Sequence, residues 1–349
     1  MSLSVVRRLA AGVGSLALLA SGVLADRSTA APVRQHHRHP VAHNTCHRNQ
    51  IAVPRCGVLW GMFRMSTPDT PYWKPHLGKF ERAGHRRFDI VKNYTDWAPG
   101  DTFPNPAFTH LGNHHRLVYM SWNLINYKTH QRPSYASVIR GAWDKSVIRP
   151  EARRLKHYHH RIVVDIDHEF DSEAQAGKGT PEQYAAMYRH VVRVMRRAGV
   201  HNVIWSWVST GYLGNEAKIR RGYPGRRFVD WIGYDPYNFA QCQHAPWRGP
   251  AATFRPFYRW TAHQRGMRHK PLILAEYGSA QGPKVGRWYA GVGPTLRQLP
   301  RIKAALQFSA TSSGPKCTLT LGASRAALDG FSRSGRSSYV LGRSAGVRR

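Results

Sequence analysis

The feature that most constrains this sequence is a regular alternation of short apolar runs with longer segments that can form helices. Eight runs rich in β-branched and aromatic residues are each followed by a helix-compatible segment. Such runs are typical of strands that are buried on both faces of a parallel sheet covered by helices. Eight strand–helix units in a chain of 349 residues predict an α/β fold, a single-domain (β/α)8 TIM barrel. The predicted strands are Val58–Phe63, Phe88–Lys92, Leu117–Trp122, Ile162–Asp167, Val203–Val208, Val229–Tyr234, Leu272–Tyr277 and Ile302–Phe308.

The clearest helix signal follows the fourth run. Thr180 is a typical N-cap, Pro181 suits the first helical position, and Gly199 suits the end of the helix. The weakest unit lies between Ser209 and Arg227, where the sequence predicts only a short helix among glycines.

The N-terminus has the pattern of a secretory signal peptide. Arg7 and Arg8 precede the short apolar stretch Leu9–Leu24, and small side chains favour cleavage after Ala25. The stretch is too short for a comfortable membrane span, and no later segment is apolar over a sufficient length. We therefore expect residues 1–25 to be removed and the mature protein to be secreted and extracellular.

Composition suggests how the rest of the chain is divided. We expect a basic His-rich linker at residues 26–50, the catalytic barrel at 51–331 and a basic disordered tail at 332–349. The linker histidines could hold a metal, but the flanking Pro, Ala and Thr favour a linker. The formal net charge is +33, from 52 Lys and Arg against 19 Asp and Glu. These charges are too dispersed to form a nucleic-acid stripe, so the partner we expect is an anionic cell-wall polymer touched by the tail.

Four cysteines suit an oxidising compartment and allow three pairings. Their spacing matches no zinc site. Cys242 follows the sixth predicted strand and Cys317 the eighth, so both belong on the same rim of the barrel. Cys46 and Cys56 lie close together before the first strand. We therefore favour disulfides Cys46–Cys56 and Cys242–Cys317.

Two of the seven glutamates stand at the ends of predicted strands, where barrel enzymes place their reacting groups. These are Glu169, after the fourth strand, and Glu276, in the seventh. Two carboxyls on one rim suit glycoside hydrolysis, in which one protonates the leaving oxygen and the other attacks the sugar. The alternative is two isolated acids, each solvated or paired with Arg.

Aromatic residues near the strand ends favour a carbohydrate cleft, because sugar rings pack on flat aromatic faces. Trp122 ends the third strand, Trp207 lies on the fifth, and Tyr237 follows the sixth. Alternate residues such as Trp205 are better explained as core.

Several motifs in order resemble one known family. They are Ser121-Trp-Asn123, Asp167-His-Glu-Phe170, Val203-Ile-Trp-Ser-Trp207, Val229-Asp-Trp-Ile-Gly-Tyr-Asp-Pro-Tyr-Asn238 and Lys270-Pro-Leu-Ile-Leu-Ala-Glu-Tyr-Gly-Ser279. Over roughly Gly57 to Phe331 the chain resembles glycoside hydrolase family 26, the β-mannanase-type members of a clan of retaining (β/α)8 glycosidases.

The resemblance implies a role for each matching residue. Glu169 would be the acid/base and Glu276 the nucleophile. His168, Asp235 and Tyr237 would line the subsite next to the cleavage point, with the Tyr237 hydroxyl hydrogen-bonded to Glu276. Trp122 would form part of the sugar floor, and Trp207 is a further expected substrate contact. Two alternatives stay open, since Asp235 could cap the turn before Pro236 and Tyr237 could serve packing alone.

Two departures from the family pattern affect the substrate. Phe170-Asp-Ser-Glu173 replaces the usual Met-Asn-Gly and nearby tryptophan, and Phe308-Ser309 stands where a tryptophan is frequent. The expected function is a secreted, retaining endo-β-glycanase without cofactor or metal, a monomer that acts on β-1,4-mannan. A β-1,4- or mixed-linkage β-glucanase, and a non-catalytic basic polymer-binding protein, remain the alternatives.

Overall fold

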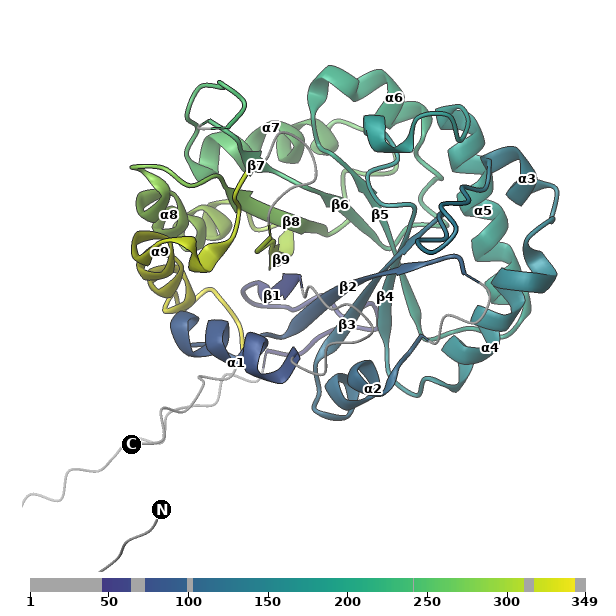
Figure 1. Ribbon diagram of the computed structural model, residues 1–349, viewed down its shortest axis with the longest axis horizontal. Coiled ribbons are helices and arrows are strands. Elements are labelled where there is room, and N and C mark those ends of the chain that lie inside the picture. Colours follow the sequence, from purple (N-terminus) through teal and green to yellow (C-terminus); the bar gives the residue numbers. More distant parts are fainter. Residues whose placement is uncertain (1–45, 64–72, 99–102, 241, 311–316, 343–349) are drawn as a thin grey trace, which may run out of the picture. The chain divides into compact units, whose positions relative to one another are not determined.

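The computed structural model describes residues 46–63, 73–98, 103–240, 242–310 and 317–342, which form a closed parallel barrel (Figure 1). Its hydrogen-bonded order is β1-β2-β3-β4-β5-β6-β8-β9, and β9 pairs with β1 to close the ring. The predicted (β/α)8 barrel is therefore confirmed. The strands are β1 Leu59–Phe63, β2 Ile90–Asp96, β3 Leu117–Asn123, β4 Ile162–Ile166, β5 Val203–Ser209, β6 Trp231–Tyr234, β8 Leu272–Ser279 and β9 Ile302–Gln307, with the two-residue β7 Tyr237–Asn238 paired to the end of β8.

Helices surround this barrel on its outer side (Figure 1). The helix after β4 begins at the predicted N-cap, where Thr180 and Gln183 form a reciprocal capping box. The unit after β5 holds a three-residue 3-10 helix and a six-residue α-helix, which fits the short helix expected there. The helices are α1 Trp73–Gly84, α2 Pro106–Asn113, α3 Tyr135–Ile139, α4 Arg149–His157, α5 Pro181–Arg197, α6 Glu216–Arg221, α7 Pro250–Ala262, α8 Val285–Gln298 and α9 Arg325–Gly335. None of the described helices is both long and apolar enough to cross a membrane.

The apolar core lies in two shells because side chains alternate along each strand. On β5, Ile204 and Val208 face the barrel interior, whereas Trp205 and Trp207 pack against the surrounding helices. The same alternation on β2 points Ile90 into the interior and therefore also Lys92, which is fully buried. The upper interior is thus polar, and this places charge directly beneath the strand ends.

The barrel extends further in both directions than the sequence predicts. Residues 332–342, expected in a disordered tail, complete α9 and then return to the barrel, where Val340 is buried and bridges Val58. Arg86 donates hydrogen bonds to the carbonyls of Gly335 and Gly342 and so holds this return. At the other end, residues 46–50 belong to a turn against the barrel rather than to a linker. The predicted signal peptide, the rest of the linker and residues 343–349 lie outside the described residues.

Both predicted disulfides are present, Cys46–Cys56 and Cys242–Cys317. The second joins the loops after β7 and β9. Around it is a small apolar cluster that includes Tyr237 and Phe308. This bridge therefore fastens two loops of the rim on either side of β8.

We predict that the Cys242–Cys317 bridge contributes to stability. Because it closes a separation of 75 residues, replacing both cysteines by serine should lower the free energy of unfolding by up to about 4 kcal/mol. Chemical denaturation measures this loss. Peptide mapping without reduction should recover both cysteines in one linked fragment, and recovery of Cys46 linked to Cys317 would contradict the pairing.

Candidate active site

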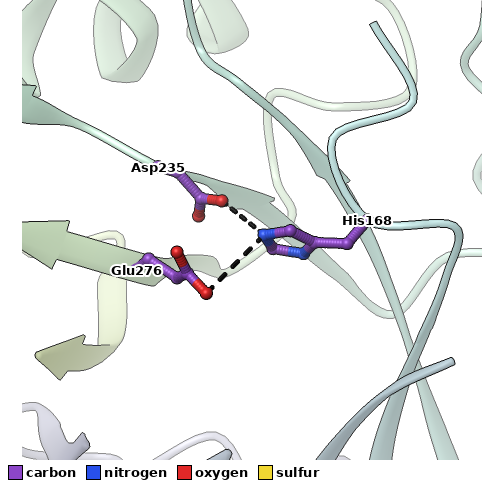
Figure 2. A group of neighbouring side chains, drawn as sticks. All are labelled: His168, Asp235 and Glu276. Carbon is purple, nitrogen blue, oxygen red and sulfur yellow. Dashed lines mark ion pairs between the residues drawn. The ribbon is translucent and has the colours of Figure 1, made fainter. Parts of the chain in front are cut away.

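A cavity of about 1230 Å³ opens at the carboxyl ends of the barrel strands. The structure brings five of the predicted site residues together at its wall, namely His168, Glu169, Asp235, Tyr237 and Glu276. Figure 2 shows three of them, with the imidazole of His168 facing the carboxylates of Asp235 and Glu276. The predicted cluster of acids is therefore one site and not a set of isolated strand ends.

A β-bulge directs Glu276 into the cavity. Leu274 lies opposite Ala305 and Tyr277 opposite Gln307. Between these two pairs β8 has two residues where β9 has one. Ala275 faces the barrel interior, and strict alternation would turn the next residue outward. Because of the bulge Glu276 lines the cavity instead, and Tyr277 points outward, where its hydroxyl accepts a hydrogen bond from the Trp60 indole.

Three donors surround the carboxylate of Glu276. Lys92 Nζ lies 2.8 Å and the Tyr94 hydroxyl 2.5 Å from Oε1, and the Tyr237 hydroxyl donates to Oε2. Burial alone would raise the pKa of Glu276, but the Lys92 ammonium, His168 and these hydrogen bonds outweigh burial and lower it. Glu276 is therefore kept ionised, the state in which it can attack.

His168 lies between two further carboxylates. Its Nε2 is 2.6 Å from Asp235 Oδ2, and its Nδ1 is 3.2 Å from Asp165 Oδ2. Burial and the neighbouring Lys92 act to lower the pKa of His168, but Asp235 and Asp165 overcome them and raise it well above its usual value. The ring is thus held as an imidazolium that faces the cavity.

The turn that carries Glu169 is an unusual one. Asp167 and Glu169 have φ angles of 56° and 51°, in the left-handed region that non-glycine residues seldom occupy. The Asp167 carboxylate is buried and accepts hydrogen bonds from the Tyr135 hydroxyl at 2.8 Å and from Lys178 Nζ at 2.5 Å. These contacts hold the turn in the conformation that presents His168 and Glu169 to the cavity.

Glu169 has the opposite environment to Glu276. None of the described residues donates a hydrogen bond to the carboxyl group of Glu169, which lies at the cavity wall. Burial, Asp235 and the charge of Glu276 raise the pKa of Glu169 well above its usual value, although His168 opposes them. Glu169 is therefore held protonated beside an ionised Glu276, the division that acid/base and nucleophilic roles need.

The same residues could in principle take a metal ion. His168, Asp235 and Glu276 offer ligand atoms that lie within 4.8 Å of one another (Figure 2). However, Lys92 Nζ already lies 2.8 Å from Glu276 Oε1 and 3.3 Å from His168 Nε2. An ammonium at this point supplies the positive charge that a metal would bring and repels a second cation, so the donor set fits a metal poorly.

The structure corrects the prediction for two tryptophans. Trp122 is 2% exposed and packs on Trp97, with its indole donating to the carbonyl of Asp96. Trp207 is fully buried between Phe170 and the helical layer. Neither lines the cavity, because both occupy outward positions in the alternation of their strands.

Sequence reasoning missed further residues of the site, among them Lys92, Tyr94, Tyr127 and Tyr212. Lys92 and Tyr94 follow Ile90 at alternate positions of β2, so an alternation argument could have directed them inward. Tyr127 and Tyr212 are 48% and 68% exposed, and both line the cavity. They lie in loops after β3 and β5, where the sequence gives no strand pattern from which to place them.

A known protein family matches more than half of this chain. Residues 100–281 match glycosyl hydrolase family 26. Endoglucanase H of Acetivibrio thermocellus is 26% identical over 242 residues, which are 66% of this chain, and the chain spans only about a quarter (26%) of that relative's length.

Solved structures of low identity share the fold. A GH26 β-mannanase from Bacteroides ovatus superposes with a TM-score of 0.60 at 17% identity, covering 82% of this chain and 91% of that one. A modular endo-β-1,4-mannanase from Cellulomonas fimi gives 0.57 at 18% identity, with 82% and 72% covered. Because the family match spans more than half of this chain, the chain belongs to glycosyl hydrolase family 26.

Proposed function

We propose that this protein is a secreted, retaining endo-β-glycanase that cleaves β-1,4-mannan by double displacement. The observation that carries the proposal is the opposite tuning of two carboxyls in one cavity. Lys92 and its neighbours keep Glu276 ionised, whereas burial and neighbouring negative charge keep Glu169 protonated. A polymer-binding protein would have no use for such a pair, because the two groups repel each other when both are charged.

In the first half-reaction Glu276 attacks the anomeric carbon of the sugar. The bond between that carbon and the glycosidic oxygen breaks, and Glu169 gives its proton to the leaving oxygen. The product is a covalent ester between the sugar and Glu276. His168 and Asp235, on the wall beside Glu276, are placed to bind hydroxyl groups of the same sugar.

In the second half-reaction Glu169, now ionised, accepts a proton from water as the water attacks the anomeric carbon. The ester bond breaks, and the Glu276 carboxylate is regenerated. Two inversions at one carbon retain the β configuration. The Tyr237 hydroxyl, which hydrogen-bonds Glu276, supports the carboxylate as it departs.

The choice of mannan is supported by the mannanases among the structural neighbours. A β-glucanase is the second candidate, because the curated relative is named an endoglucanase. Phe63 and Phe308, stacked with ring centres 5.1 Å apart, line the cavity wall beside β1 and β9 and offer an apolar surface to either polymer.

The proposal also includes the setting of the enzyme. Two disulfides and the N-terminal sequence pattern support secretion. The proposed oligomeric state is a monomer. The basic C-terminal residues would contact anionic cell-wall polymer. This contact would begin near residue 343, since residues up to 342 are part of the barrel domain.

Release of reducing sugar from a panel of mannans, β-glucans and xylans tests the function. We expect the largest release from β-1,4-mannan, with the β-anomer as the first product seen by proton NMR. Preference for β-glucan would select the second candidate, and no release from any polysaccharide would contradict the proposed activity.

Substitution of the two glutamates tests their roles. Glu276→Gln should nearly abolish turnover, whereas Glu169→Ala should lose about 100- to 10,000-fold on polysaccharide and far less on an activated aryl glycoside. Added azide should rescue Glu169→Ala by attacking the glycosyl–enzyme and giving a β-glycosyl azide. Glu182→Ala, at an exposed position of α5, is the matched control. Rescue of the Glu276 variant instead would reverse the assignment.

The pH dependence of activity follows from the two carboxyls. Activity should rise with pH as Glu276 ionises and fall as Glu169 loses its proton, which gives a bell-shaped curve. Tyr237→Phe removes a donor that favours ionised Glu276, so the pKa of Glu276 rises and the acidic limb moves to higher pH. The upper limb should move little. An unchanged acidic limb in kcat/KM profiles would show that Tyr237 serves packing alone.

Tyr212 is expected to bind a sugar of the leaving group. Its loop is fastened to the segment after Glu169, since Thr210 donates two hydrogen bonds to the Asp171 carboxylate. Tyr212→Ala should therefore raise KM about three- to tenfold for oligosaccharides, whereas Tyr212→Phe, which keeps the ring face, should not. An aryl glycoside carries no sugar in its leaving group and therefore provides the control substrate. Equal losses in both variants would indicate a different role.

A further inference from the structure

Lys92 is a basic group that reaches the site from inside the barrel. Its side chain is fully buried, and Nζ lies 2.8 Å from Glu276 Oε1 and 3.2 Å from the Tyr94 hydroxyl. The rings of Tyr94 and Tyr119 lie 4.6 and 5.5 Å from the ammonium, within the range of cation–π attraction. The ammonium is thus packed on every side, and it cannot turn away from Glu276 into solvent.

The other charged groups that interact with Glu276 or His168 come from three strands or the loops after them. His168 and Glu169 follow β4, which also carries Asp165; Asp235 follows β6, and Glu276 is on β8. The buried carboxylates of Asp165 and Asp235 contact the imidazolium of His168. Lys92 therefore has Glu276 as its direct anionic partner.

We propose that Lys92 is a positioning residue that favours the second half-reaction over the first by stabilising Glu276 whenever it is a free carboxylate. The inference rests on the proposed function, since it assumes that Glu276 is the nucleophile. Its basis is the direct contact between a fully buried ammonium and one carboxylate oxygen.

The charge of Glu276 changes through the proposed catalytic cycle. Attack on the sugar converts the carboxylate to a neutral ester, so the ion pair with Lys92 is lost while the ammonium stays buried. This loss raises the free energy of the glycosyl–enzyme. When water attacks and the ester bond breaks, the negative charge returns to the oxygen beside Lys92, and the ion pair forms again. Lys92 therefore slows formation of the intermediate and accelerates its breakdown.

Pre-steady-state kinetics with a dinitrophenyl glycoside tests the proposal. Lys92→Met removes the charge at similar side-chain length. We expect the rate constant of breakdown to fall about ten- to hundredfold, while the first burst of dinitrophenolate keeps or gains rate. The glycosyl–enzyme should accumulate, which intact-protein mass spectrometry detects. The acidic limb of kcat/KM should also move to higher pH, because the pKa of Glu276 rises once Lys92 is gone.

Two further variants separate charge from hydrogen bonding and guard against misfolding. Lys92→Gln keeps an N–H donor without the charge, and it should behave like Lys92→Met; it carries the test if the methionine variant does not fold by circular dichroism. Lys92→Arg keeps the charge and should recover part of the breakdown rate. Lys270→Met, at the opposite end of the barrel, is the matched control and should leave the burst unchanged.

The outcomes distinguish this inference from the proposed function. If both half-reactions slow equally in Lys92→Met and Lys92→Gln, with the acidic limb unmoved, the inference fails although the enzyme remains a retaining glycanase. If the wild-type protein forms no ester on Glu276, the proposed mechanism itself fails. Accumulation of the ester only in the uncharged variants supports the inference.

Discussion

The buried ion pair between Lys92 and Glu276 is the interaction on which the active site depends. The two residues lie on β2 and β8, which are not neighbours in the barrel, so the pair crosses the interior beneath the cavity. A buried ammonium is costly unless a carboxylate faces it at short range, and a buried carboxylate needs the same compensation. Each residue therefore compensates the burial of the other, with the Lys92 side chain fully buried and that of Glu276 only 7% exposed at the cavity wall. The consequence reaches beyond stability, because the pair fixes which of the two carboxyls is ionised.

The rest of the site extends this charge separation across the cavity. His168 is cationic because Asp165 and Asp235 flank it, and it lowers the pKa of Glu276 in turn. Glu169 lies beyond this network and has Asp235 and Glu276 as negative neighbours, which raise its pKa. The hydrogen-bond donors to Glu276 thus come from β2 and β7, and the proton remains on Glu169, in the turn after β4. One arrangement of fixed charges assigns both roles, so neither carboxyl needs to be tuned separately.

The sequence predicts most of the fold because each strand is a short apolar run, and burial on both faces leaves a clear pattern. It also predicts that Glu169 and Glu276 share one rim of the barrel, and the structure places both at the same cavity. It fails where direction depends on local geometry. The bulge in β8 has no sequence signature and decides that Glu276 and not Tyr277 enters the cavity. Trp122 and Trp207 have aromatic character suited to sugar, but their positions in the alternation turn them to the helices. Lys92 stands at the end of a run predicted as a buried strand, where a charge is explained only by its partner across the barrel.

The loops around the cavity show why the fixed charges can work without rearrangement. β7 pairs with the end of β8, so the backbone of Tyr237 is hydrogen-bonded next to the strand that carries Glu276. The Cys242–Cys317 bridge packs against the same tyrosine, and Asp171 ties the loop after β5 to the segment after Glu169. Donors held by strand pairing, a disulfide and buried hydrogen bonds lose little orientational freedom when substrate arrives. In the proposed double displacement the carboxylate of Glu276 becomes an ester and is then regenerated, and such rigidity would keep Lys92, Tyr94 and Tyr237 in place while their partner is uncharged. The departing oxygen therefore meets donors that are already oriented.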